Sequence, residues 1–315
     1  MRPSGAPLAG LDDVAWGRLH HAYGAATDVP GQLRALISPD EDERLQAYRE
    51  LSGNVYHQGT RWQASGQVIP FLAALADDPA TPERERVIGL LSALAVGDRD
   101  DTHLPFDPAK AFAAAAGVTA ADVARTLNLL YGADDLHGEG GPCGEDGAEA
   151  AVDVDAVAVS WDRDAYRAAA AISDRFVSWT TDADQVVAAR AAELLVWFPA
   201  TGPAVSALLD VPGTDGRELA RASANLTLGH LGADDPAIER RLTGLLAAGV
   251  YGVRLTAAVA LALRQGERIP EAALEALVEA RDRADEIHTG AFPLPWNRSL
   301  LGFSALALHR IGLAP

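Results

Sequence analysis

A short pattern, Arg-x-x-(Ala/Val)-x-x-x-Leu, recurs along this chain and constrains its fold more than any other feature. It occurs complete at Arg44, Ala47 and Leu51, at Arg84, Val87 and Leu91, and at Arg254, Ala257 and Leu261. Its apolar part recurs at Ala191 with Leu195 and at Ala222 with Leu226. A spacing of four places the two apolar residues on one face of a helix. The leucines lie 40, 31 and 35 residues apart (51 to 91, 195 to 226, 226 to 261), which predicts repeated pairs of helices.

Capping residues, prolines and glycines separate the predicted helices. Thr81-Pro82-Glu83-Arg84, for example, offers an N-cap, a proline for the first turn and an acid near the positive end of the helix dipole. We expect helix pairs at 31–37 with 42–55, 66–77 with 82–96, 107–116 with 120–131, 162–179 with 184–197, 202–210 with 215–231, 235–247 with 251–265, and 271–286 with 297–311.

The composition favours helices over sheets. Hydrophobic residues make up 49% of the 315 residues but aromatic residues only 6%, so Ala, Leu and Val must build most of the interior. Ala and Leu are strong helix formers, whereas β-branched and aromatic residues dominate strands. We therefore expect an all-α protein.

One segment, 132–160, interrupts the repeats. Its first half is acidic and rich in glycine, which predicts an exposed loop. Its second half alternates through Val152, Val154, Val157 and Val159 towards Trp161, which favours a short extended segment. We interpret 132–160 as an insertion or a hinge. The predicted organisation is then a capping segment (1–27), helical repeats (28–131), the insertion (132–160), and further repeats with a C-terminal cap (161–315).

Over residues 28–131 and 162–311 the recurring helices resemble HEAT repeats, of the armadillo type. The block Gly53-Asn54-Val55-Tyr56-His57-Gln58-Gly59-Thr60, with Trp62 and Val68-Ile69-Pro70-Phe71-Leu72 after it, is similar to an opening block in bacterial HEAT-like proteins. The resemblance implies a right-handed α-solenoid of about six to seven degenerate helix pairs with one acidic, glycine-rich insertion. It implies a binding role and identifies no reaction and no catalytic residue.

The densest polar cluster lies within residues 53–65. Its candidate binding residues are Asn54, Tyr56, His57, Gln58, Arg61 and Trp62. If the preceding helix continues to about Gln58, then Asn54, His57 and Gln58 share one helix face. Such a set could recognise a peptide or a polar ligand, or it could satisfy helix ends and fix one repeat against the next. Catalysis is a third, weaker alternative.

The other histidines and acids offer no metal site by spacing. His20 and His21 are adjacent and would point in different directions on a helix, so we expect them in a capping helix. The loop of Asp98, Asp100, Asp101 and His103 has the residue types of a cation site but is typical of solvated acids. We expect neither a metal nor another cofactor.

Charge narrows the choice of partner. The chain has 44 acidic and 26 basic residues, a formal charge of −18, which disfavours nucleic acid and favours a basic protein partner. A single cysteine, Cys143, excludes an intramolecular disulfide. The N-terminus lacks the apolar core of a signal peptide, and no apolar run reaches the ~20 residues of a membrane span, so we expect a cytoplasmic monomer or weak dimer.

The leading functional hypothesis is a non-catalytic, protein-binding HEAT-repeat scaffold or adaptor, for instance an immunity-type protein that neutralises a basic partner. The alternative is an enzyme that binds a small molecule at a polar-aromatic site around Tyr56, His57, Gln58 and Trp62. HEAT-like DNA glycosylases and bilin lyases are a third possibility, and the former need a basic groove that this composition disfavours.

Overall fold

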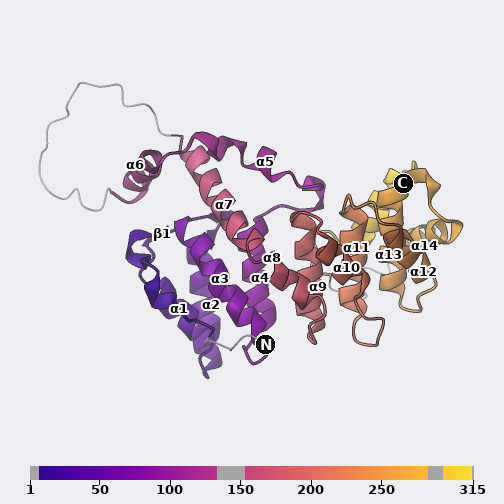
Figure 1. Cartoon of the computed structure of the whole chain (residues 1–315), viewed down its shortest axis with the longest axis horizontal. Coiled ribbons are helices and arrows are strands. Elements are labelled where there is room, and N and C mark those ends of the chain that lie inside the picture. Colours follow the sequence, from indigo (N-terminus) through magenta and orange to yellow (C-terminus); the bar gives the residue numbers. More distant parts are fainter. Residues whose placement is uncertain (1–6, 133–152, 283–293, 314–315) are drawn as a thin grey trace, which may run out of the picture. The chain divides into compact units, whose positions relative to one another are not determined.

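The computed structural model describes residues 7–132, 153–282 and 294–313. The chain forms two compact units, the first of Met1–Gly97 with Pro108–Ala169 and the second of Asp98–Asp107 with Ala170–Pro315. Helices dominate both units, which confirms the all-α class (Figure 1). Within the described ranges, no helix has both the length and the apolarity needed to cross a bilayer.

The first unit combines helices with two small hairpins. Its helices are α1 (Val29–Ala35), α2 (Glu41–Val55), α3 (Gln63–Asp77), α4 (Arg84–Val96), α5 (Pro108–Ala111), α6 (Ala120–Tyr131) and α7 (Val154–Ala170), with short 3-10 helices at Leu11–Asp13, Trp16–Arg18 and Ala113–Gly117. Its antiparallel hairpins are β1 (His20–His21) with β2 (Gly24–Ala25), and β3 (Tyr56–His57) with β4 (Thr60–Arg61). Helix α1 packs on α2, and α3 packs on α4.

Most of the helices of the second unit pack in two rows, and the last two that the structure describes pack on α13. The helices are α8 (Ser173–Trp179), α9 (Gln185–Leu194), α10 (Gly202–Leu209), α11 (Glu218–His230), α12 (Pro236–Leu245), α13 (Tyr251–Gln265), α14 (Glu271–Asp282) and α16 (Leu300–Arg310), with 3-10 helices at Asp101–His103, Leu195–Trp197 and Gly266–Arg268. Helices α9, α11 and α13 pack side by side in one row, and α8, α10 and α12 pack in the other. Successive helices therefore pair across the two rows.

Small side chains allow the inner helices of the second unit to approach closely. A Cβ atom on Gly229 of α11 would lie 2.8 Å from the Cα atom of Ala260 on α13, so only glycine fits there. On its other side α11 donates hydrogen bonds to α9, from Ser223 to the carbonyl of Ala189 (2.6 Å) and from Thr227 to the carbonyl of Ala192 (2.7 Å). The alanine-rich, aromatic-poor composition is thus the composition that this close packing requires.

The arginine of the recurring pattern has the same role in each complete copy. Arg44, Arg84 and Arg254 lie in the first turns of α2, α4 and α13. They donate to carbonyls at or just after the end of the preceding helix, those of Ser38 (3.0 Å), Ala76 (2.7 Å) and Ala248 (3.1 Å). Ala76 belongs to the last turn of α3, whose carbonyls lack partners within the helix and carry partial negative charge, so a cation stabilises them. Ser38 and Ala248 lie in the turns that follow α1 and α12. The pattern therefore marks the turn between two paired helices.

Two predicted elements are wrong. The alternating valines form the first turns of α7, where Ala156, Val157, Ser160 and Trp161 are buried at helical spacing, and Val152 lies outside the described residues. Likewise, the predicted capping helix around His20 and His21 is the β1–β2 hairpin, in which Gly24, with φ 131°, begins β2 opposite His21. The glycine-rich half of the predicted insertion lies outside the described residues beyond Gly132.

Candidate functional site

The helix expected at 42–55 ends where predicted and does not continue to Gln58. Helix α2 stops at Val55, and residues 56–61 form the β3–β4 hairpin instead. Its two turn residues, Gln58 and Gly59, both have positive φ (49° and 81°), as a two-residue hairpin turn requires. Asn54 therefore shares no helix face with His57 or Gln58, and that expectation is wrong.

The two hairpins lie against each other. The backbone N–H of Ala22 donates to the carbonyl of Asn54 (2.9 Å), and the hydroxyl of Tyr23 lies 3.2 Å from Nδ1 of His57. On the other side of β1, Tyr131 of α6 donates to the carbonyl of His21 (2.7 Å), and burial raises the pKa of Tyr131 to about 12. His57 thus contacts the first polar-aromatic segment, a contact that sequence spacing did not reveal.

A polar network centred on the half-exposed carboxylate of Asp28 connects this region to α1 and α2. Nε2 of His21 lies 2.9 Å from Oδ1 of Asp28, whereas Oδ2 accepts from the side-chain amides of Gln32 (3.0 Å) and Asn54 (2.9 Å). Asn54 also donates to the amide oxygen of Gln32 (3.3 Å). Sequence reasoning missed Asp28 and Gln32, because an Asp before Val29-Pro30 reads as a helix cap, and its side chain makes no capping bond here.

Arg61 lies in the interior of the first unit, with 2% of its surface exposed. Its Nε and Nη2 pair with the two carboxylate oxygens of Asp162 on α7, at 2.6 and 2.5 Å. A Cβ on Gly97, which follows α4 at φ 73°, would lie 2.6 Å from Nη1 of Arg61. The guanidinium therefore packs on a bare backbone and joins β4 to α7.

Trp62 packs against other aromatic rings. Its indole stacks on Trp161 of α7, with ring centroids 5.5 Å apart, and contacts the ring of Tyr131 at 6.4 Å. Trp62 and Trp161 also line a cavity of about 330 Å³ between the beginnings of α3 and α6 and the middle of α7. Tyr56, His57 and Gln58 are not among the residues that line this cavity, so the four residues of the enzymatic alternative do not share it.

The structure thus divides the six predicted site residues into two groups. Arg61 and Trp62 contact α7, and Asn54 belongs to the Asp28 network, so these three connect elements of the fold. Tyr56, His57 and Gln58 form the hairpin between them, and Gln58 is exposed. Ligand binding by any of the six stays a prediction.

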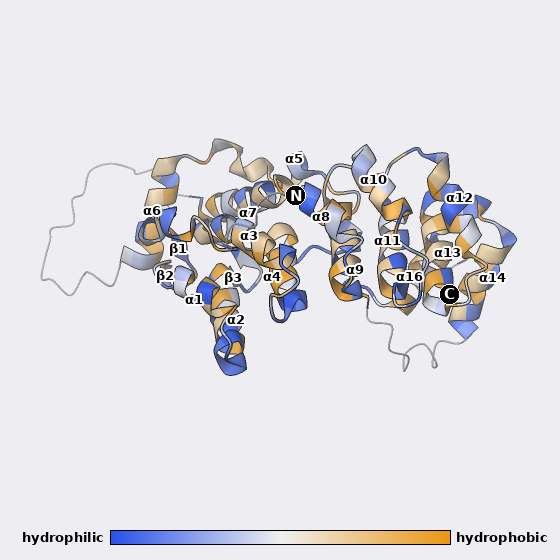
Figure 2. Cartoon of the chain, turned by 60° about the horizontal axis from the view of Figure 1, so that its bottom comes forward, coloured by the Kyte–Doolittle hydropathy of each residue, from blue (hydrophilic) through white to orange (hydrophobic). Residues whose placement is uncertain are grey.

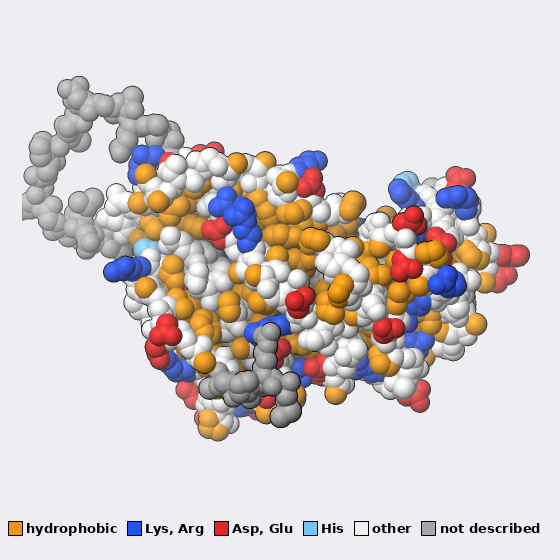
Figure 3. Space-filling view, viewed as in Figure 1, with side chains coloured by type: hydrophobic (Ala, Val, Ile, Leu, Met, Phe, Trp, Pro, Cys, Tyr) orange, Lys and Arg blue, Asp and Glu red, His pale blue; other side chains and the backbone are white. Residues whose placement is uncertain are grey.

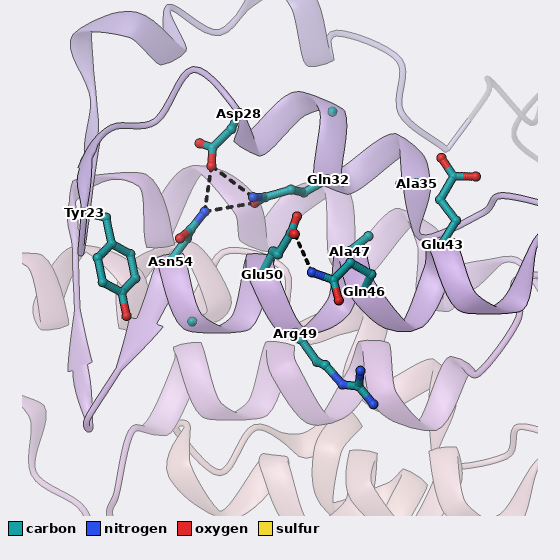
Figure 4. Close-up of a pocket in the computed structure, with 12 residues that line it drawn as sticks. Tyr23, Asp28, Gln32, Ala35, Glu43, Gln46, Ala47, Arg49, Glu50 and Asn54 are labelled. Atoms are coloured by element: carbon teal, nitrogen blue, oxygen red, sulfur yellow. Dashed lines mark hydrogen bonds between the residues drawn. The ribbon is translucent and has the colours of Figure 1, made fainter.

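A groove of about 860 Å³ lies near these residues, between α1 and α2, and is shown in Figure 4. From α1 and the residues before it, the groove is lined by Tyr23, Asp28, Gly31, Gln32 and Ala35. From α2, it is lined by Glu43, Gln46, Ala47, Arg49, Glu50, Gly53 and Asn54. Much of α2 is hydrophilic, as Figure 2 shows, because charged residues occupy its first turn.

A second hollow, of about 760 Å³, lies in the second unit and was not predicted from the sequence. It is lined by the ends of α11 and α13, by α16 and by residues 101–105. Arg298 pairs there with the buried Asp101 (2.7 Å), and His230 stacks on Trp296 (5.8 Å between ring centroids). Burial lowers the pKa of His230 to about 4, so this imidazole is neutral near pH 7.

His230 makes stability depend on pH. Its pKa is 6.5 when unfolded and about 4 when folded, so the unfolded chain binds the proton more tightly. We therefore expect stability to fall as pH drops from about 6.5 to 4, by up to about 3 kcal/mol from this group. Urea titrations of the wild type and of His230→Phe, which keeps an aromatic ring against Trp296, measure the effect.

Burial raises the pKa of Glu193, so this residue makes stability rise as the pH falls, opposite to His230. Both proteins contain Glu193, so the difference between their pH profiles of stability reports His230 alone. The wild type should lose more stability than His230→Phe between pH 6.5 and 4. Parallel pH profiles would contradict the assignment.

No cluster of three or more potential metal ligands occurs in the part of the chain that the structure describes. Of the acid-rich loop, Asp101 pairs with Arg298, and Asp100 accepts from Thr102 (3.0 Å). Comparison of the chain with protein-family models, curated proteins and solved structures gave no match.

Proposed function

We propose that this protein is a non-catalytic, HEAT-like scaffold that binds a basic protein partner. In the finer form of the proposal it neutralises that partner, as an immunity protein neutralises a toxin or nuclease. The alternative of a small-molecule enzyme has less support, because Tyr56, His57 and Gln58 do not line the cavity that Trp62 lines.

The observation that carries the proposal is the repeated arginine contact. Arg44, Arg84 and Arg254 each bind a carbonyl at or just after the end of the preceding helix, which supports equivalent helix pairs along the chain. The two rows of helices in the second unit are the arrangement expected of stacked pairs. Stacked helix pairs present extended surfaces, on which binding spreads over many residues rather than into one catalytic pocket.

Charge supports the choice of a basic partner. The formal charge of −18 attracts cationic proteins and repels phosphate backbones. On the face shown in Figure 3, basic side chains occur in separate small groups, many of them beside carboxylates. Complementary fields accelerate association, and salt weakens them.

Affinity capture at two ionic strengths tests the proposal. The immobilised full chain should retain a basic protein from the lysate of its source cells at about 0.1 M salt and release it at about 1 M, because salt screens surface charges. Mass spectrometry identifies the retained protein. Retention of only neutral or acidic proteins, or release that is indifferent to salt, would overturn the proposal.

A further inference from the structure

We propose that the groove between α1 and α2 is the docking site for an arginine-bearing segment of the partner protein. The inference rests on the proposed function and names the surface and the chemistry of recognition. It depends on the hydrogen-bonding groups that the groove presents, on its shape, and on the aromatic ring at one end.

Asn54 lines the groove with an amide whose orientation is fixed by its neighbours. Only 8% of its surface is exposed, and both N–H groups of its amide are used, by Asp28 and Gln32. Exchanging its nitrogen and oxygen would set an oxygen against the carboxylate of Asp28, so the network fixes the orientation of the amide. Figure 4 shows Oδ1 of Asn54 turned away from Asp28 and Gln32, both of which contact its amide nitrogen.

Carboxylates continue the row of acceptors along α2. Glu50 lies one turn before Asn54, about 6 Å away along the axis, and Glu43 lies two turns further. Gln46 donates its amide to Glu50 (2.6 Å), which uses a donor that would otherwise face the groove. The one cation among the lining residues, Arg49, points away from Glu50 and Asn54 in Figure 4. The hydroxyl of Ser38 donates to Glu43 in turn. With its carboxylates and no cation directed at them, the groove favours a ligand that is rich in donors and positively charged.

The shape of the groove admits a chain segment. Gly31 on α1 and Gly53 on α2 line it, and a Cβ atom added to either would meet no atom within 4 Å. Ala35 and Ala47 contribute only methyl groups. The space between the helices is therefore open rather than filled by side chains.

Guanidinium groups fit these features better than ammonium groups do. A planar guanidinium has five donors in a fixed geometry and can bind a carboxylate and a neighbouring carbonyl together. It also stacks on aromatic rings. Tyr23, whose surface is 66% exposed, lines the groove and provides such a ring.

The test measures binding of dye-labelled hexa-arginine to the full chain by fluorescence anisotropy at about 150 mM salt, where long-range attraction is screened. One variant, Glu43→Gln with Glu50→Gln, removes two carboxylates from the groove. Its control, Glu271→Gln with Glu275→Gln, makes the same charge change on α14. Glu271, like Glu43, lies in the first turn of its helix, and Glu275, like Glu50, is exposed. The groove variant should bind about tenfold more weakly, since each exposed ion pair contributes up to about fivefold, and the control should change by less than about twofold.

A second pair of variants tests the groove without changing charge. Gly53→Leu should weaken binding severalfold because the side chain enters the groove, whereas Gly244→Leu on α12, also in open space, should leave binding unchanged. Circular dichroism confirms that all variants are folded.

Equal weakening by the two charge variants, no effect of Gly53→Leu, or equal affinity for hexa-lysine would overturn the inference. Capture of the partner by the groove variants distinguishes failure of this inference from failure of the proposed function. If the groove variants still retain that partner in a salt-sensitive manner, only the docking site is wrong. If the wild type retains no basic protein, the proposed function fails as well.

Discussion

Replacement of Arg61 by methionine is expected to lower the free energy of unfolding of the first unit by about 3 kcal/mol, the lower end of the range for breaking a buried ion pair. Methionine keeps much of the aliphatic volume but leaves the carboxylate of Asp162 without its bidentate partner. It also removes the cation beside the end of α4 at Gly97. Urea denaturation followed by circular dichroism and tryptophan fluorescence measures the loss.

A double-mutant cycle provides the control. Arg61→Met combined with Asp162→Leu should cost less than the sum of the two single changes, because the double variant leaves no unpaired charge. Arg49→Met, on the exposed surface of α2, should change stability by less than about 0.5 kcal/mol. A loss below about 1 kcal/mol for Arg61→Met would mean that the pair contributes no more than an exposed one.

Replacement of Trp62 by alanine is expected to cost about 3 kcal/mol, whereas His57→Ala should cost less than about 1 kcal/mol. The indole of Trp62 packs on Trp161 and Tyr131, so truncation leaves a void beside an existing cavity. The imidazole of His57 contacts Tyr23 at the surface of the hairpins. Thermal unfolding of the two variants compares these costs directly.

The reverse result would change the interpretation of the whole block. If Trp62→Ala left the melting temperature unchanged but abolished partner capture, Trp62 would belong to the recognition surface. If His57→Ala cost as much stability as Trp62→Ala, the contact between the hairpins would be a main support of the first unit.

Sequence reasoning predicted most of the helices, and the reason is local. Residues three and four apart share a helix face, so Ala47 and Leu51 identify a buried face without knowledge of what covers it. Gly97 similarly marks the end of α4 through its own backbone preference. The cap predicted at Thr81, with Pro82 in the first turn, is wrong, because α4 begins at Arg84 after Glu83. Each of these signals depends on a few neighbouring residues, which a linear sequence displays.

Local preference gives wrong predictions where it is weak or ambiguous. Val154, Val157 and Val159 fit alternation as well as helical spacing, and burial of Val157 with Trp161 decided for the helix. The residues after Val55 continued a plausible helix, but the positive φ of Gln58 and Gly59 turned them into a hairpin. A two-residue turn is hard to recognise in a sequence when only one of its residues is glycine.

The sequence by itself determined the all-α class, the repeated arginine and the acidic charge, because these follow from composition and short spacing. Only the tertiary structure decided what the polar residues do. Arg61 and Asp162 are 101 positions apart, and Asp28 meets Asn54 across 26 positions. Such pairs form when helices that are distant in the chain pack together and exclude water, which makes each unpaired buried group costly. The groove between α1 and α2 arises for the same reason, since its row of acceptors exists only once Asn54 has given both of its donors to Asp28 and Gln32.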